Sequence, residues 1–169
     1  MKKIDYGSCD ACGKPLLARR FNFIRHVERC LYGQDESDDG VTIIVLRAEE
    51  LAAYCSRECA WPAILTSLAE RGVRHTGSGV GPVEVCAKCG GPVMMSHPHV
   101  AYNVHDETEF RQPWLTHVDV HDAEALADVC VRCDGDVEAD SANLPEPEEM
   151  ESPEAVGALL PVTTRTKGG

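Results

Sequence analysis

Cysteine is the residue with the clearest chemical potential in this chain of 169 residues, which contains nine of them. Cys30 stands alone, and the other eight form pairs separated by two or three residues. The pairs are Cys9 and Cys12, Cys55 and Cys59, Cys86 and Cys89, and Cys130 and Cys133. Two thiolates at this spacing can bind one metal ion, whereas they are poorly placed to bridge each other. The pattern favours metal-bound thiolates over disulfides or an iron–sulfur cluster.

The cellular compartment also decides between metal-bound thiolates and disulfides, because disulfides persist in proteins that are exported to an oxidising environment. The first residues, MKKIDYGSCDAC, turn polar after two lysines and lack the apolar run of a signal peptide. Nowhere does the chain approach 18 consecutive apolar residues, so we expect no membrane span. These features predict a cytoplasmic protein with reduced cysteines.

The cysteine pairs belong to a tandem repeat. CDACGKP begins at Cys9 and CAKCGGP at Cys86, and AEELAAYCSREC at Ala48 is matched by AEALADVCVRC at Ala123. The first pair of segments is offset by 77 residues (86 minus 9) and the second by 75 (123 minus 48), a difference that a loop can absorb. We therefore expect two metal sites of four cysteines, with two zinc ions per chain. The ligands are Cys9, Cys12, Cys55 and Cys59 in the first repeat and Cys86, Cys89, Cys130 and Cys133 in the second.

A closed site of four cysteines has a structural role, because no coordination position is left for water or substrate. Gly13 and Gly90 follow the first pair of each repeat and can adopt the positive φ that such a turn needs. Aromatic residues make up only 5% of the chain, so its core is thin. A structural zinc contributes on the order of 10 kcal/mol to folding and can replace part of that core.

The motif Cys-x-x-Cys-Gly, followed by a hairpin and a second cysteine pair, resembles the zinc-ribbon and treble-clef classes of zinc finger over roughly residues 5–134. The resemblance implies a small, metal-stabilised α+β fold with β-hairpins and short helices. We expect unit 1 at residues 1–72, a linker at 73–82, unit 2 at 83–134, and an acidic disordered tail at 135–169. These classes include nucleic-acid binders and protein adaptors, so the resemblance does not choose a function.

Sequence periodicity predicts the elements between the cysteine pairs. Apolar residues from Trp61 to Leu68 recur on one face and predict a helix over about 61–71, with Pro62 in its first turn and Gly72 after its end. We expect strands over 21–32, 41–46, 100–104 and 115–120. The alanine-rich stretches 48–53 and 123–128 predict short helical turns.

Charge separates the two halves of the chain, whose net charge is −12. Residues 1–80 are balanced, whereas 81–134 contain 3 basic and 9 acidic residues and 135–169 contain 2 and 8. Acid on unit 2 and the tail opposes binding to phosphate backbones. The first hairpin is the exception, because basic and aromatic side chains alternate there and predict a surface for DNA or RNA as one alternative. Its residues are Lys14, Arg19, Arg20, Phe21, Phe23, Arg25 and Arg29.

A bland alternative also fits this hairpin: a solvated surface whose arginines balance the acidic loop 35–39. The tail has three interpretations of its own. It is an inert solubilising segment, a segment that folds on a partner through the apolar residues 156–160, or a cover for the basic hairpin.

Catalytic patterns are weak. His117, Asp119 and His121 would share one side of a strand and could bind a third metal ion, although an ordinary solvated strand face shows the same alternation. H-x-E occurs at 26–28 and 105–107, but no cysteine pair follows a proline as in zinc deaminases. Cys30 and His26 share a strand face, and a buried spectator thiol explains Cys30 as well as a nucleophile does.

The sequence thus predicts a zinc-stabilised, non-catalytic adaptor that recognises a protein partner through an acidic surface and regulates or inhibits it. Binding of nucleic acid through unit 1 is the second interpretation, and a metal-dependent enzyme using the histidines of unit 2 is the third. The sequence does not define the oligomeric state.

Overall fold

The computed structural model of the protein describes residues 4–33, 40–112 and 114–134. The predicted tail at 135–169 and the acidic loop 35–39 lie outside the described residues. The described elements are β1 (Arg19–Tyr32), β2 (Val41–Tyr54), α1 (Arg57–Glu70), β3 (Val83–Val85), β4 (Pro92–Met94), β5 (His99–Gln112), β6 (Leu115–Val129) and the 3-10 helix η1 (Val131–Cys133).

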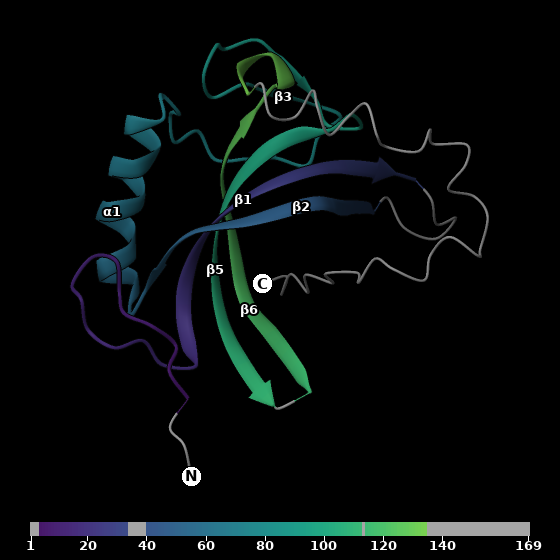
Figure 1. Ribbon diagram of the computed structural model, residues 1–169. Helices are drawn as coiled ribbons and strands as arrows, with labels where there is room; N and C mark the ends of the chain where they lie inside the picture. Colours follow the sequence, from purple (N-terminus) through teal and green to yellow (C-terminus); the bar gives the residue numbers. More distant parts are fainter. Residues whose placement is uncertain (1–3, 34–39, 113, 135–169) are drawn as a thin grey trace, which may run out of the picture.

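Four long strands form one antiparallel sheet in the order β2-β1-β5-β6. Each repeat contributes a hairpin, and the two hairpins join through their inner strands β1 and β5. In Figure 1 the hairpins cross and diverge, with β1 and β2 running to the right and β5 and β6 running down. Strands β3 and β4 form a separate small sheet beside the third cysteine pair. The two repeats are therefore halves of one continuous sheet.

The two hairpins are related by an approximate two-fold rotation. In each hairpin two register shifts lie four residues apart, after Phe23 and Val27 in β1 and after Tyr102 and Asp106 in β5. These positions are 79 residues apart (102 minus 23), and Ile24 pairs with Asn103 at the same offset. Because antiparallel pairing of equivalent positions is what a two-fold axis produces, the axis passes beside this pair.

One hydrophobic core serves both repeats. It includes Phe23 and Val27 of β1, Val100 of β5, Leu126 of β6 and Ile64 of α1, all fully buried. The segment predicted as a linker is also tied down, since the Thr76 and Gly77 amides donate to the Leu126 carbonyl. Helix α1 lies beside the sheet (Figure 1) and is the last element of the first repeat.

Several predicted elements are confirmed and two are wrong. A helix forms as expected, but it begins at Arg57 rather than near Trp61, because the Ser56 side chain accepts a hydrogen bond from the Cys59 amide and caps it. The helical turns predicted at 48–53 and 123–128 do not exist, because both stretches are strand, in β2 and β6. Pairing with β1 and β5 outweighs the helix propensity of alanine there.

Candidate metal centres and exposed surfaces

The first cysteine set is assembled where the N-terminal turn meets the end of β2. The Gly13 amide donates to the Cys9 carbonyl, and Gly13 has the predicted positive φ of 73°. Asp10 bonds to Ala53 twice, through its own amide and through its carboxylate. These contacts place Cys12 beside Cys55, and helix α1 then brings in Cys59 from its first turn.

The second set repeats this construction. The Gly90 amide donates to the Cys86 carbonyl with φ at 76°, and the Ala87 amide donates to the Asp128 carbonyl at the end of β6. Cys130 and Cys133 follow directly, with η1 in place of the helix. The Cys130 amide also donates to the Cys86 sulfur at 3.4 Å, as expected for a thiolate held by backbone N–H groups.

The sulfur geometry fits a tetrahedral ion. Zinc–sulfur bonds of about 2.3 Å require sulfur atoms about 3.8 Å apart. The Sγ–Sγ distance is 3.6 Å for Cys12 and Cys55, 3.7 Å for Cys55 and Cys59, and 3.8 Å for Cys89 and Cys130. All four sulfurs in each set lie within 4.8 Å of one another, and none of these cysteines is in a disulfide. The two predicted cysteine sets are thus both brought together as possible metal sites.

The electrostatics of each set also favour a cation. Burial raises the pKa of Cys9, but the amides of Cys55, Cys12 and Ala11 more than compensate and lower it to about 6. Cys86 behaves in the same way, with its pKa also lowered to about 6. The hydrogen bond with Cys12 is the main cause that raises the pKa of Cys55 to about 12. Four crowded sulfurs cannot all ionise unless a positive ion neutralises them.

The histidine strand of unit 2 does not converge in the same way. His117 contacts Asp119 at 2.6 Å, and His121 bonds to Thr108 at 2.7 Å. Within residues 4–33, 40–112 and 114–134, only the two cysteine sets gather three or more potential ligand atoms within 4.8 Å. His117, Asp119 and His121 therefore share an exposed face without forming a preassembled site.

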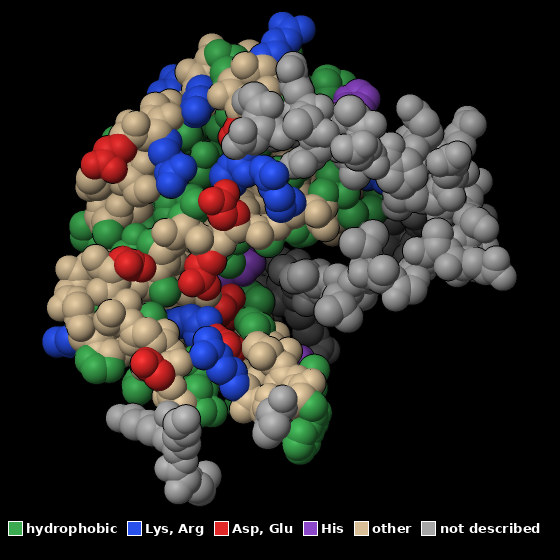
Figure 2. Space-filling view, viewed as in Figure 1, with side chains coloured by type: hydrophobic (Ala, Val, Ile, Leu, Met, Phe, Trp, Pro, Cys, Tyr) green, Lys and Arg blue, Asp and Glu red, His purple; other side chains and the backbone are tan. Residues whose placement is uncertain are grey.

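The basic residues proposed for nucleic acid are largely engaged elsewhere. Phe23 is fully buried and stacks on Tyr102, with ring centroids 5.9 Å apart. Arg25 is buried and lies 2.7 Å from Asp134. Phe21 is partly buried, Arg29 is buried, and Lys14 is exposed. Figure 2 shows blue and red side chains interspersed over the visible face.

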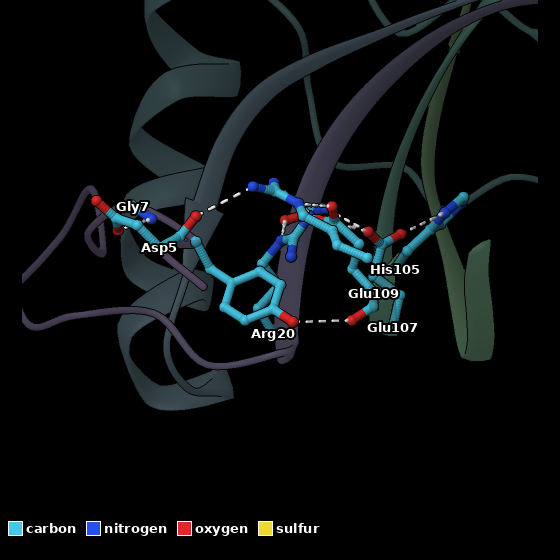
Figure 3. A network of polar contacts seen from close by, with 9 residues as sticks. Asp5, Gly7, Arg20, His105, Glu107 and Glu109 are labelled. Carbon is cyan, nitrogen blue, oxygen red and sulfur yellow. Dashed lines mark hydrogen bonds and ion pairs between the residues drawn. The ribbon is translucent and has the colours of Figure 1, made fainter. Parts of the chain in front are cut away.

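Arg20 is an example of a basic side chain whose partners lie within the sheet. Its guanidinium lies 2.5 Å from Glu109 and 3.7 Å from Glu107, both on the neighbouring strand β5 (Figure 3). Glu107 also accepts a hydrogen bond from the side-chain Nδ2 of Asn22 at 2.5 Å. Arg19, which is more exposed, forms a bidentate contact with Asp106. Arg19, Arg20 and Arg25 of unit 1 therefore lie against carboxylates of unit 2.

An apolar cluster stands exposed at the tip of hairpin β5–β6, at the lower right of Figure 2. We call it the apolar tip: Phe110, Trp114, Leu115 and Val118, with exposed fractions of 47%, 82%, 56% and 41%. The strand register places Phe110 and Leu115 on one face of the hairpin and Val118 on the other. The exposed acids Asp119 and Asp122 follow on β6. Sequence reasoning missed this cluster, although a tryptophan next to a turn proline between two predicted strands was a usable signal.

Comparison with known proteins adds no relative. No family model, curated protein or solved structure matches the chain. None of the helices in the described part of the chain is long and apolar enough to cross a membrane.

Proposed function

We propose that the protein is a non-catalytic adaptor that uses two structural zinc ions to hold a rigid sheet and presents the apolar tip to a protein partner. Zinc suits both sites, because four thiolates in a tetrahedral arrangement are its usual structural ligands. Both units are proposed to be zinc-ribbon-like or treble-clef-like fingers that have fused their hairpins. The observation that carries the function is the tip, where Trp114 is 82% exposed and Phe110, Leu115 and Val118 on the adjoining strand ends are also exposed.

Exposed aromatic clusters are typical of binding surfaces, because tryptophan and its neighbours gain most when a partner covers them. The stack of the Phe110 and His117 rings, with centroids 6.3 Å apart, restricts the Phe110 side chain. A preorganised side chain loses less entropy on binding. These features favour a partner with an apolar pocket that accepts the Trp114 indole.

The charge around the tip adds a second requirement for the partner. Exposed Asp119, Asp122 and half-exposed Glu124 follow the tip along β6. Strand β6 is an outer strand of the described sheet, and residues 76–87 cover its edge at Leu126 and Asp128, so a partner can approach along the part nearer the tip. A pocket bordered by lysine or arginine would complement this surface, and an acidic surface of this kind can also occupy a site meant for phosphate.

The experiment is to identify the bound protein by cross-linking in the native cell and then measure its affinity for purified variants. Trp114→Ala should weaken binding at least about 30-fold, as for a residue at the centre of an interface. Asp119→Lys with Asp122→Lys should slow association and reduce its salt dependence. Leu17→Ala is the matched control, because Leu17 is 72% exposed but lies in unit 1, and it should leave binding unchanged. Equal affinity of Trp114→Ala and wild type would refute the proposed surface.

A further inference from the structure

A buried polar cluster lies on the face of the sheet where the two-fold axis passes. His26 and Glu28 of β1 and His105 and Glu107 of β5 are equivalent under the 79-residue offset, so the H-x-E motif occurs once in each repeat. The two histidine rings meet edge to face, with centroids 5.4 Å apart. Both carboxylates are buried, with 6% of Glu28 and 5% of Glu107 exposed.

The two carboxylates differ in how their charge is neutralised. Glu107 has Arg20, a permanent cation, at 3.7 Å (Figure 3). The position equivalent to Arg20 in the other repeat is His99 (20 plus 79), and it lies 3.8 Å from Glu28. Among the described residues, Glu28 has one other ion-pair partner, His26, at 3.2 Å. A buried carboxylate with only imidazoles beside it is costly unless a cation joins it.

His99 is oriented as a metal ligand. Its Nδ1 lies 2.9 Å from the His97 carbonyl, and only an N–H on Nδ1 can make that bond. The lone pair is then on Nε2, the atom that faces Glu28. This Nε2 is buried without a hydrogen-bond partner, and the residue is 1% exposed. A histidine whose other nitrogen is fixed by a carbonyl is the usual arrangement at metal sites.

A third donor with a free atom lies nearby. Asp128 of β6 pairs with Ala101, the residue two positions after His99, and it interacts electrostatically with both His99 and Glu28. The Ser78 hydroxyl donates to Asp128 Oδ2 at 2.5 Å, while Oδ1 is buried without a hydrogen-bond partner. Asp128 and His99 therefore each leave one buried atom unsatisfied within the same cluster.

We propose that His99 Nε2, Glu28 and Asp128 Oδ1 bind a further divalent cation of the zinc type. One imidazole and two carboxylates are ligands that such ions accept, and two atoms 3.8 Å apart can share an ion at about 2.1 Å from each. These three donor atoms do not all lie within 4.8 Å of one another, so binding has to draw the Asp128 carboxylate toward His99 and Glu28. A cavity of about 120 Å³ borders the cluster at Glu28 and at Ser78, the residue that donates to Asp128, although His99 and Asp128 do not line it.

Equilibrium dialysis of the full chain against Zn²⁺, followed by metal analysis, tests this site. Wild type should bind one zinc ion more than the cysteine sets account for. His99→Asn should lose only that ion, because an asparagine amide still donates to the His97 carbonyl but has no atom at the Nε2 position. His117→Gln is the matched control, since its side chain is 61% exposed on the other histidine cluster, and it should keep the ion.

The outcomes separate cleanly. Wild type that binds no zinc beyond the cysteine sets, or His99→Asn that keeps the extra ion, overturns the proposal. Loss of the ion in His117→Gln instead assigns it to the exposed strand and also overturns it. If His99→Asn loses cysteine-bound metal as well, its fold has changed, and Asp128→Asn takes its place with the same expected loss of one ion.

Discussion

The two repeats build the same cysteine site but cover it by different means. In the first, Ser56 starts helix α1 at the second cysteine pair, and Ile64 and Leu68 of that helix are buried in the core. In the second, the pair ends in the three-residue η1, and residues 74–78 fill the role by bonding to Ala87, Leu126 and Asp128. The ligand geometry is a local property of each repeat, whereas the cover is provided by whichever segment the sheet brings near.

Removing one metal site tests whether the two repeats fold independently or as one sheet. It has the largest expected effect on the free energy of unfolding. Cys12→Ser and Cys89→Ser each remove one ligand and should each cost several kcal/mol, from a metal contribution on the order of 10 kcal/mol. Because β1 and β5 pair and share a core, each variant should still unfold in a single transition. Metal content and thermal unfolding measure this. A variant in which one half melts while the other stays folded would show that the units are independent.

The helix is the cover that belongs to the first repeat alone, so truncating its core side chain measures what that cover contributes. Ile64 is fully buried, and Ile64→Ala should lower the free energy of unfolding by about 2–5 kcal/mol through lost burial and a residual cavity. The control is Leu65→Ala, because Leu65 is 38% exposed. Chemical denaturation would contradict this account if the two variants lost similar stability.

A buried histidine of the second repeat near the two-fold axis, His105, should make the free energy of unfolding depend on pH. Burial, and then the neighbouring His26, lower the pKa of His105 to about 4 from 6.5. The folded state therefore binds fewer protons than the unfolded state between these values, and stability falls as the pH drops from 6.5 to about 4. The cost reaches about 3 kcal/mol and is fully absent above pH 6.5. His105→Gln should remove this component, which denaturation at pH 5 and pH 7 measures. An unchanged difference between the two pH values would exclude His105 as its source.

Both cysteine sets could be predicted from the sequence, because ligand spacing and a following glycine are local features. Cys9 and Cys86 start turns that Gly13 and Gly90 close with positive φ, as predicted. The pairing of β1 with β5 was not readable, because it joins residues about 80 apart by a choice of register. That pairing buries Arg20 against Glu109. The alanine-rich stretches are strand because they pair within each hairpin, one with β1 and the other with β5. Charge patterns on a strand therefore predicted a surface where the fold places an ion-pair network.

The smallest expected effect concerns the start of the helix. Ser56 Oγ accepts from the Cys59 amide at 3.2 Å, and Ser56→Ala should cost about 1 kcal/mol. The second repeat has Val131 at the corresponding place, and η1 has no side-chain cap. Ser67→Ala, late in the same helix, serves as the control and should change the melting temperature less. Equal shifts for both variants would mean that the cap contributes nothing specific.

Metal content is the most direct test of the account, measured by native mass spectrometry of freshly purified protein before and after strong chelator. The account predicts a zinc ion in each cysteine set, eight cysteines without disulfides, and loss of the folded state once the zinc is withdrawn. Protein that carries no metal, keeps its fold in chelator and shows bridged sulfurs would contradict it.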